Sequence, residues 1–434
     1  MNDDQAGKLL HIIIRDIATV LSPELSSPRA QFTAGAVTSL LQAIAAAGTE
    51  PNISNTRTEG AGADLAALLA VAEARRGHDA AGDRDSAYSE SGSGLQRSVA
   101  AASGTLPPIQ ADELIAYLKA RNANDHWPDR AEIRQVAGGF SKQTFLVELS
   151  GAGHPAQSIV LRRDLPFAPL RSSVTDEYRI LKAVGERGLA VPRVLWCEAD
   201  AGALGAATLA VERVAGTCDA TTWSADPAIA AGVIRQTAQL LASLHQLPVD
   251  ELPATVSRVP GAVGTTPPEM VADIQSYWNQ VRFEPNALVD GLFDWLHAHA
   301  PAGFVRRALV HGDFGFHNLL IADGRIQALL DWEFVHVGDA AEDLAYARPF
   351  VEKLVAWDDF RALYRQYGGV DVDAGTMRFY AVLGTLRVAI GCFAILDELY
   401  RGDARLDSKL VYVGHSFGEQ FAIDAARTAL SPSD

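Results

Sequence analysis

Apolar residues recur at helical spacing through the first 82 residues, as in "AGKLLHIIIRDIATVL" and "ADLAALLAVAEARR". This pattern predicts a small all-helical domain over residues 1–82. The stretch that follows is rich in Gly, Ser and Ala and poor in large apolar residues, which favours a linker over residues 83–108. We therefore expect a second domain to begin close to residue 109.

Beyond the linker, strand and helix patterns alternate. We expect a helix in "QADELIAYLKARN", strands in "EIRQVAGG", "TFLVEL" and "SIVLRR", a helix in "VTDEYRILKAVGERG" and a strand in "ATLAVERV". From about residue 224 the pattern is mainly helical. A sheet-rich lobe over residues 109–215 and a helical lobe over residues 216–434 follow the order of elements in protein kinases. The expected fold class is therefore α+β, a kinase-like two-lobe fold preceded by a small all-α domain.

The charge of the chain argues against nucleic acid as a partner. Acidic residues number 53 and basic residues 37, which gives a formal net charge of −16. Such a surface repels a phosphate backbone. The cysteines Cys197, Cys218 and Cys392 are widely spaced and form no metal-binding pattern, which fits a reducing, cytoplasmic setting.

A membrane association is not expected either. The first residues, "MNDDQAGK", are acidic where a secretory leader would be basic. The most apolar stretch, "MRFYAVLGTLRVAIGCFAIL" from Met377, carries Arg387 near its centre, and we interpret it as a buried helix.

The chemistry is concentrated in "LVHGDFGFHNLLIADGRIQALLDWE", from Leu309 to Glu333. Asp313 and Asn318 have the Asp-then-Asn spacing of a kinase catalytic loop, and Asp331 ends the next apolar strand. Phosphoryl transfer requires a carboxylate at the attacking hydroxyl, oxygen ligands for Mg²⁺ and a cation on the nucleotide phosphates. We therefore expect Asp313 to be the base or hydroxyl-orienting group and Asn318 and Asp331 to bind the metal.

Three motifs, "HGDFGFHNLL", "LLDWE" and "GDAAEDLAYA", resemble those of the aminoglycoside phosphotransferase and choline kinase group. The resemblance runs from about residue 130 to 400, and it is greatest to the branch that also occurs fused to acyl-CoA dehydrogenases. It implies a small-molecule kinase that uses ATP or GTP with Mg²⁺. The acceptor it implies is a hydroxyl compound, either a hydroxyacyl-CoA-type metabolite or an aminoglycoside-like molecule.

The same resemblance implies the nucleotide-binding residues. The segment "AGGFSKQTF" resembles the loop that covers the nucleotide, with Gly138, Gly139 and Ser141, although an ordinary hairpin turn is an equal alternative. Arg162 falls where kinases place the lysine that holds the phosphates, and Arg can bind phosphate bidentately. Its implied partner is Glu177, for which a solvated helix charge is the alternative. The hinge that meets the nucleotide base is expected at Glu212–Val214.

Supporting roles follow in the helical lobe. By resemblance, His311 and Asp343 brace the catalytic loop and Glu333 supports the metal site. Asp339 and Glu342 have the spacing of a helix capping box, and we prefer that structural role to a substrate contact.

A competing pattern, Gly-His-Ser-Phe-Gly around Ser416, matches the nucleophile elbow of α/β-hydrolases. That mechanism requires a His after the nucleophile, and no His follows His415 in the chain. We therefore expect a C-terminal helical segment with a Gly-rich break instead. A second alternative is a nucleotide-binding regulatory or scaffold protein without catalysis. In either case the N-terminal helical domain is a candidate for self-association or partner binding, because its apolar faces need burial.

Overall fold

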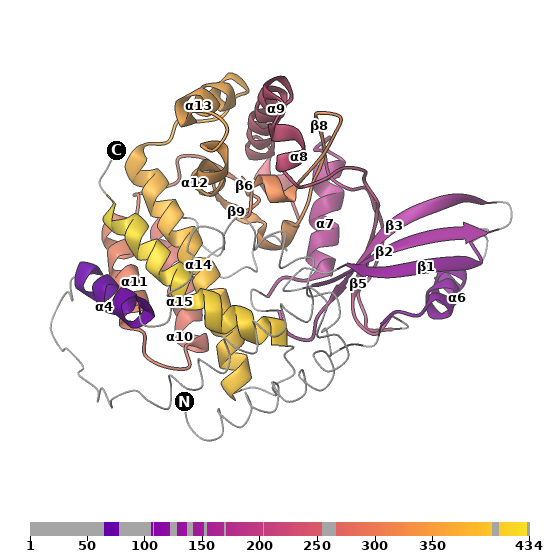
Figure 1. Cartoon of the computed structure of the whole chain (residues 1–434), viewed down its shortest axis with the longest axis horizontal. Helices are drawn as coiled ribbons and strands as arrows, with labels where there is room; N and C mark the ends of the chain where they lie inside the picture. Colours follow the sequence, from indigo (N-terminus) through magenta and orange to yellow (C-terminus); the bar gives the residue numbers. More distant parts are fainter. Residues whose placement is uncertain are drawn as a thin grey trace.

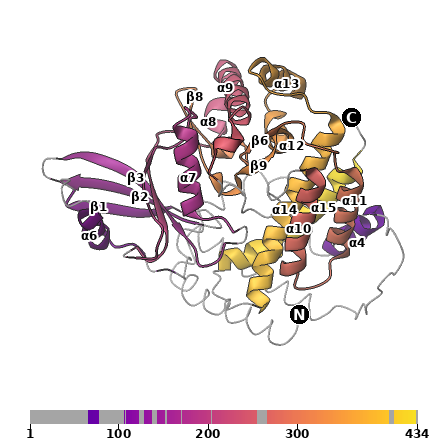
Figure 2. The same ribbon diagram turned by 180° about the vertical axis from the view of Figure 1, so that it is seen from behind.

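The computed structural model describes residues 65–77, 106, 108–121, 128–136, 142–151, 154–168, 171–202, 204–253, 266–401 and 408–431. A five-stranded sheet with two helices packed on it forms one end of the molecule, and a large helical body forms the other (Figure 1). The same division is visible from behind (Figure 2). The expected order of a sheet-rich lobe followed by a helical lobe is therefore confirmed.

The sheet of the first lobe is antiparallel throughout, with strand order β1-β2-β3-β5-β4. Four of its strands were expected from the sequence. The fifth, β4, was missed, because "VLWCE" is a short run that pairs with one neighbour and lies half-buried. The bounds are β1 Arg130–Val136, β2 Lys142–Gly151, β3 His154–Asp164, β4 Val194–Glu198 and β5 Thr208–Glu212.

Two helices cover opposite faces of this sheet. Helix α6, Ala111–Arg121, packs Leu114 and Leu118 against Phe145 and Leu161 in a small apolar core. Helix α7, Val174–Gly185, lies on the other face, towards the helical lobe (Figure 1). It begins where the Ser173 side chain accepts hydrogen bonds from two backbone N–H groups of the first turn, as an N-cap residue does.

Two short β-ribbons and eight helices make up the described part of the helical lobe. Strand β6 pairs with β9, and β7 pairs with β8, all antiparallel. The bounds are α8 Thr221–Ser224, α9 Pro227–His245, α10 Pro267–Val281, α11 Ala287–His299, β6 Arg307–Val310, β7 Leu319–Ala322, β8 Arg325–Leu329, β9 His336–Asp339, α12 Ala340–Val351, α13 Trp357–Gln366, α14 Ala374–Arg401 and α15 Ser408–Leu430. Three 3₁₀ turns, Val249–Glu251, Phe316–Asn318 and Trp332–Phe334, join these elements.

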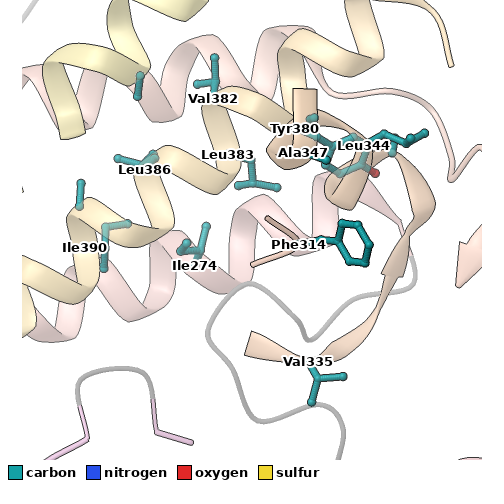
Figure 3. Close-up of a cluster of buried hydrophobic side chains, with 14 of the residues drawn as sticks. Ile274, Phe314, Val335, Leu344, Ala347, Tyr380, Val382, Leu383, Leu386 and Ile390 are labelled. Atoms are coloured by element: carbon teal, nitrogen blue, oxygen red, sulfur yellow. The ribbon is translucent and has the colours of Figure 1, made fainter. Parts of the chain in front are cut away.

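Helix α14 forms the centre of this lobe. Figure 3 shows its Leu383 and Leu386 beside Ile274 of α10 and Phe314, in one cluster of buried side chains. Among the described residues, α14 alone is long and apolar enough to cross a membrane, but 78% of its most apolar window is buried inside the protein. The expectation of a buried helix is confirmed. Since Phe314 adjoins Asp313, this core also anchors the loop that carries the candidate base.

The C-terminal helix α15 lies along α14 and passes through the Gly-His-Ser-Phe-Gly motif without interruption. The expected Gly-rich break is wrong, because the glycines serve close packing. A Cβ at Gly414 would lie 2.8 Å from Leu396, and one at Gly418 would lie 3.2 Å from Phe393. A nucleophile elbow needs a sharp strand-to-helix turn, so Ser416 within a continuous helix does not form one.

Helix α4, Leu65–Gly77, is the described part of the expected N-terminal helical domain. It packs against α11 and α15 of the helical lobe, and its Glu73 forms an ion pair with Arg427. The rest of that domain and nearly all of the expected linker lie outside the described residues. The domain boundaries stay a prediction.

Candidate active site

The alternation of side chains along β3 decides which of two adjacent arginines reaches the junction of the lobes. Leu161 and Arg163 point to the face covered by α6, and Arg163 is held there by Gln143. Arg162 therefore points to the opposite face, towards α7. Its Nε lies 3.2 Å from Glu177 Oε2 and its Nη2 lies 2.8 Å from Asp331 Oδ1.

The structure thus brings three of the expected site residues into one ion-paired group. Burial alone would lower the pKa of Arg162, but the carboxylates of Glu177 and Asp331 outweigh it and hold that pKa above its usual range. Burial raises the pKa of Glu177, and the Arg162 guanidinium offsets only part of that rise. Glu177 is 4% exposed, so the alternative of a solvated helix charge is wrong.

Asp331 occupies an unusual backbone conformation. It follows β8 with φ 61° and ψ 66°, in the left-handed region, directly before the turn Trp332–Phe334. A non-glycine residue there costs roughly 1–3 kcal/mol, and such strain persists only where the surroundings enforce it. The conformation directs the Asp331 carboxylate to Arg162, so the strain serves the placement of this side chain.

The loop between β6 and β7 carries Asp313 and Asn318. Asn318 Nδ2 donates to Asp313 Oδ2 at 2.8 Å and to the Asp313 carbonyl at 2.9 Å. The Leu330 N–H donates to the Asn318 carbonyl at 2.8 Å, so Asn318 lies beside the end of β8 where Asp331 follows. The spacing seen in the sequence therefore does bring Asp313, Asn318 and Asp331 to the same end of the β7–β8 hairpin.

A buried carboxylate on α12 holds the start of this loop. Asp343 Oδ2 accepts from the His311 N–H at 2.8 Å, and its Oδ1 accepts from the Gly312 N–H at 2.8 Å. The same Oδ2 lies 3.1 Å from His245 Nε2 of α9. His311 in turn bonds through Nε2 to the Leu330 carbonyl at 2.9 Å, which ties the two halves of the site together. The bracing geometry expected for His311 and Asp343 is present.

Asp339 and Glu342 form the expected capping box at the start of α12. Glu342 has a further structural task, because it also contacts His336 at 3.1 Å and Arg387 at 3.1 Å in the interior. Glu333 acts on the site electrostatically, since its charge contributes to the raised pKa of Arg162.

The donor set suits magnesium bound together with a phosphate ligand. Within the residues that the structure describes, no three or more His, Cys, Asp or Glu side chains gather into a metal site. Asn318 and Asp331 would supply two oxygen ligands, which fits Mg²⁺, a cation that keeps waters and takes further oxygens from substrate phosphates. Asp331 Oδ1 already faces Arg162, and its side chain is one-third exposed.

The structure says less about the residues expected to contact the rest of the nucleotide. Gly138, Gly139 and Ser141 lie outside the described residues, between the paired strands β1 and β2. The Glu212 carboxylate accepts from the N–H and Nε of Arg193, both at 3.2 Å. Because this side chain is engaged on the surface, any contact with a base from Glu212–Val214 falls to the backbone, and that role stays a prediction.

One residue of the loop was missed from the sequence. His317, between Asp313 and Asn318, places Nε2 3.1 Å from Asp313 Oδ1. Burial alone would raise the pKa of Asp313, but the hydrogen bond and charge of His317 hold it below its usual range. The only signal was the position of His317 four residues after Asp313 inside a short turn.

Comparisons with known proteins agree with this geometry. A family model described as "Phosphotransferase enzyme family" matches residues 132–380, more than half of the chain. Acyl-CoA dehydrogenase family member 10 from Mus musculus is 27% identical over 245 residues, which cover 55% of this chain and 22% of that protein. Member 11 from Gallus gallus is 28% identical over 225 residues, which cover 50% of this chain and 28% of that protein. The matched region spans about a quarter of the length of these curated relatives.

A solved structure shares the fold. The crystal structure of a "putative aminoglycoside phosphotransferase" from Ralstonia eutropha JMP134 aligns with a TM-score of 0.54 at 20% identity. The alignment covers 73% of this chain and 97% of that one.

Proposed function

The chain belongs to the phosphotransferase enzyme family, and we propose that it transfers the γ-phosphoryl group of ATP or GTP to a hydroxyl of a small molecule. The expectations of this family and of a kinase-like fold are confirmed, and the small-molecule kinase activity is what we propose from them. The observation that carries the proposal is the Arg162 guanidinium between Glu177 and Asp331, beside the loop that holds Asp313.

Asp313 is assigned the acceptor hydroxyl. The hydroxyl oxygen attacks the γ-phosphorus while its proton passes to the Asp313 carboxylate. The bond from the γ-phosphorus to the bridging oxygen breaks, and the nucleoside diphosphate leaves with that electron pair. The Asp313 carboxyl has a pKa below its usual range and is therefore ionised at neutral pH, as a group that orients the hydroxyl and accepts its proton must be.

Arg162 is assigned the nucleotide phosphates. Its guanidinium keeps Glu177 as a fixed partner on one side, while Asp331 on the other side is exposed enough to be shared with a ligand. Arg can contact two phosphate oxygens at once, which positions the phosphoryl group more firmly than a point charge. Bound Mg²⁺, held by Asn318 and Asp331, would neutralise phosphate charge.

The contacts with the rest of the nucleotide are also proposals. Backbone N–H groups around Gly138, Gly139 and Ser141 are assigned to the phosphates, because a glycine-rich turn lets the backbone approach closely. The backbone of Glu212–Val214 is assigned to the base.

For the acceptor, we propose a hydroxyacyl-CoA-type metabolite or an aminoglycoside-like compound. The first is supported by the names of the curated relatives, which are acyl-CoA dehydrogenase family members. The second is supported by the name of the solved structure. A cytoplasmic location is kept as a proposal. Self-association through the N-terminal helical region is also a proposal, and α4, the described helix of that region, packs against α11 and α15 of the same chain.

The test is release of nucleoside diphosphate with Mg²⁺ and ATP or GTP, across hydroxyacyl-CoAs, choline-like amino alcohols and aminoglycosides. Release that requires one acceptor class, with the label of γ-phosphate recovered on that acceptor, supports the proposal. Mg²⁺-dependent nucleotide binding without turnover on any acceptor would instead favour a regulatory or scaffold protein that binds nucleotide without catalysis.

A further inference from the structure

Both oxygens of the Asp313 carboxylate are held by residues of the same short turn. Asn318 Nδ2 donates to Oδ2 at 2.8 Å, and His317 Nε2 lies 3.1 Å from Oδ1. Two anchors on opposite oxygens restrict rotation of the carboxyl group about its bond to Cβ. The Tyr346 side chain also forms a hydrogen bond that helps to lower the pKa of Asp313. A carboxylate offers about four lone-pair positions, so one remains for the acceptor hydroxyl.

The imidazole of His317 is itself built into the fold. Its ring centroid lies 5.3 Å from that of Phe350 and 6.4 Å from that of Tyr346, both on α12. Gly315 leaves the space that the ring occupies, because a Cβ there would lie 2.5 Å from His317 Cε1 and 2.7 Å from its Nδ1. The whole His317 side chain is 41% exposed, so the ring packs against α12 on one side and stays open to solvent on another.

We infer that His317 is a positioning residue for phosphoryl transfer, which holds Oδ1 of Asp313 in the orientation that receives the acceptor hydroxyl. The inference rests on the proposed function for its catalytic consequence. Nε2 carries a proton both in one neutral tautomer and in the imidazolium, so the role does not require a change of protonation. A misplaced catalytic group costs up to about a hundredfold in rate, which sets the expected size of the effect.

The first experiment compares His317→Ala and His317→Gln with a matched control, His299→Ala. His299 is also exposed, and its ring bonds to the Trp295 carbonyl within its own helix, α11. We expect His317→Ala to lower kcat by about ten- to a hundredfold with an unchanged KM for the nucleotide. His317→Gln should recover most of kcat, because its amide can donate to Oδ1. An unchanged kcat in His317→Ala, or no recovery with Gln in a fully folded protein, would overturn the inference.

The second experiment asks whether Gly315 acts through His317. Gly315→Ala should lower kcat in the wild-type background, because the new methyl group displaces the ring. In the His317→Ala background the same substitution should have a much smaller effect on kcat, because the nearest remaining contact of the new methyl group is Phe350 Cε2 at 3.2 Å. Independent, additive losses would overturn the proposed coupling between the two positions.

A third measurement does not depend on turnover, and it separates this inference from the proposed function. The ¹⁵N signals of the His317 ring, identified by their loss in His317→Gln, are recorded at one pH in the wild-type chain and in Asp313→Ala. We expect the Nε2 signal to shift when its acceptor is removed. An unchanged signal would show that the contact is absent in solution and would overturn the inference, whatever acceptor the enzyme uses.

Discussion

The Arg162 guanidinium lies 2.8 Å from Asp331 Oδ1, although the two residues are 169 positions apart and come from different lobes. Arg162 belongs to β3 of the sheet, and Asp331 follows β8 of the helical lobe. A cation assigned to phosphate and a carboxylate assigned to metal are therefore already paired. Nucleotide bound with Mg²⁺ would contact both side chains. We therefore expect nucleotide binding to affect how the two lobes lie relative to each other through this pair.

Arg162→Lys tests the bidentate role of this side chain. Lysine keeps the charge but loses the planar fork, so it cannot hold Glu177, Asp331 and phosphate in the same geometry. We expect kcat/KM for the nucleotide to fall by about tenfold or more, which corresponds to loss of one charge-assisted hydrogen bond. Steady-state kinetics with varied nucleotide measures it. Arg134→Lys, on an exposed position of β1 in the same sheet, should match wild type, and an equal loss in both variants would contradict this role.

Asp343→Asn tests the brace under the catalytic loop. Asp343 accepts the N–H groups of His311 and Gly312 on different oxygens, and an amide can accept on only one side. A buried donor left facing an NH₂ group should lower the free energy of unfolding by about 1–3 kcal/mol and reduce kcat. Denaturant unfolding and kinetics measure the two effects.

Asp250→Asn is the matched control for that substitution. Its carboxylate pairs with Arg307 but is 86% exposed, and exposed ion pairs contribute about 0–1 kcal/mol. Wild-type stability in Asp343→Asn would show that the loop does not depend on this carboxylate.

A pair of glycine substitutions separates backbone strain from helix propensity. Gly312 has φ 81°, and a Cβ there would lie 2.7 Å from the Phe334 carbonyl oxygen, so Gly312→Ala should destabilise the protein by more than about 1–2 kcal/mol. Gly232 lies inside α9, and a Cβ there would meet no atom within 4 Å, so Gly232→Ala should stabilise the protein by about 0.5–1 kcal/mol. Thermal or denaturant unfolding should give opposite signs, and the same sign for both would contradict the packing described around Gly312.

Glu342 gives the protein an acid-sensitive element. Burial alone would raise its pKa, but His336 and Arg387 outweigh this and lower the pKa from 4.5 to about 2. A depressed pKa in the folded state adds stability that is fully present above the unfolded pKa, and that is lost as pH falls from about 4.5 towards 2. The contribution is on the order of 3 kcal/mol near neutral pH.

The corresponding variant is Glu342→Gln. Its deficit in unfolding free energy relative to wild type should shrink by more than half between about pH 6 and about pH 3, because the wild-type carboxylate loses its advantage as it protonates. Denaturant unfolding at both pH values measures it. A deficit that stays constant with pH would mean that the charge of Glu342 is not what stabilises this cluster.

Much of the site could be predicted because its signals are local. The spacing of Asp313 and Asn318 lies within one turn, and the capping box of Asp339 and Glu342 lies within one helical turn. The choice of Arg162 over Arg163 agrees with the alternation of a strand, which sends neighbours to opposite faces.

What was missed depends on packing between distant segments. The glycines of α15 suggested a break, but they accommodate Leu396 and Phe393 of α14. His317 gave no pattern of its own, because its orientation is set by Tyr346 and Phe350 on α12. Such relations arise only once the chain is folded, so neither periodicity nor spacing reveals them.

Transfer of labelled γ-phosphate to the acceptor panel, measured for wild type, Asp313→Ala and Asp294→Ala, tests the assignment of the base most directly. Asp294 is an exposed carboxylate on α11 and serves as the control. We predict transfer to one acceptor class by wild type and Asp294→Ala, and a loss of at least about a hundredfold in Asp313→Ala with nucleotide binding retained. Wild-type turnover by Asp313→Ala on the same acceptor would contradict the role of Asp313 and, with it, the proposed site.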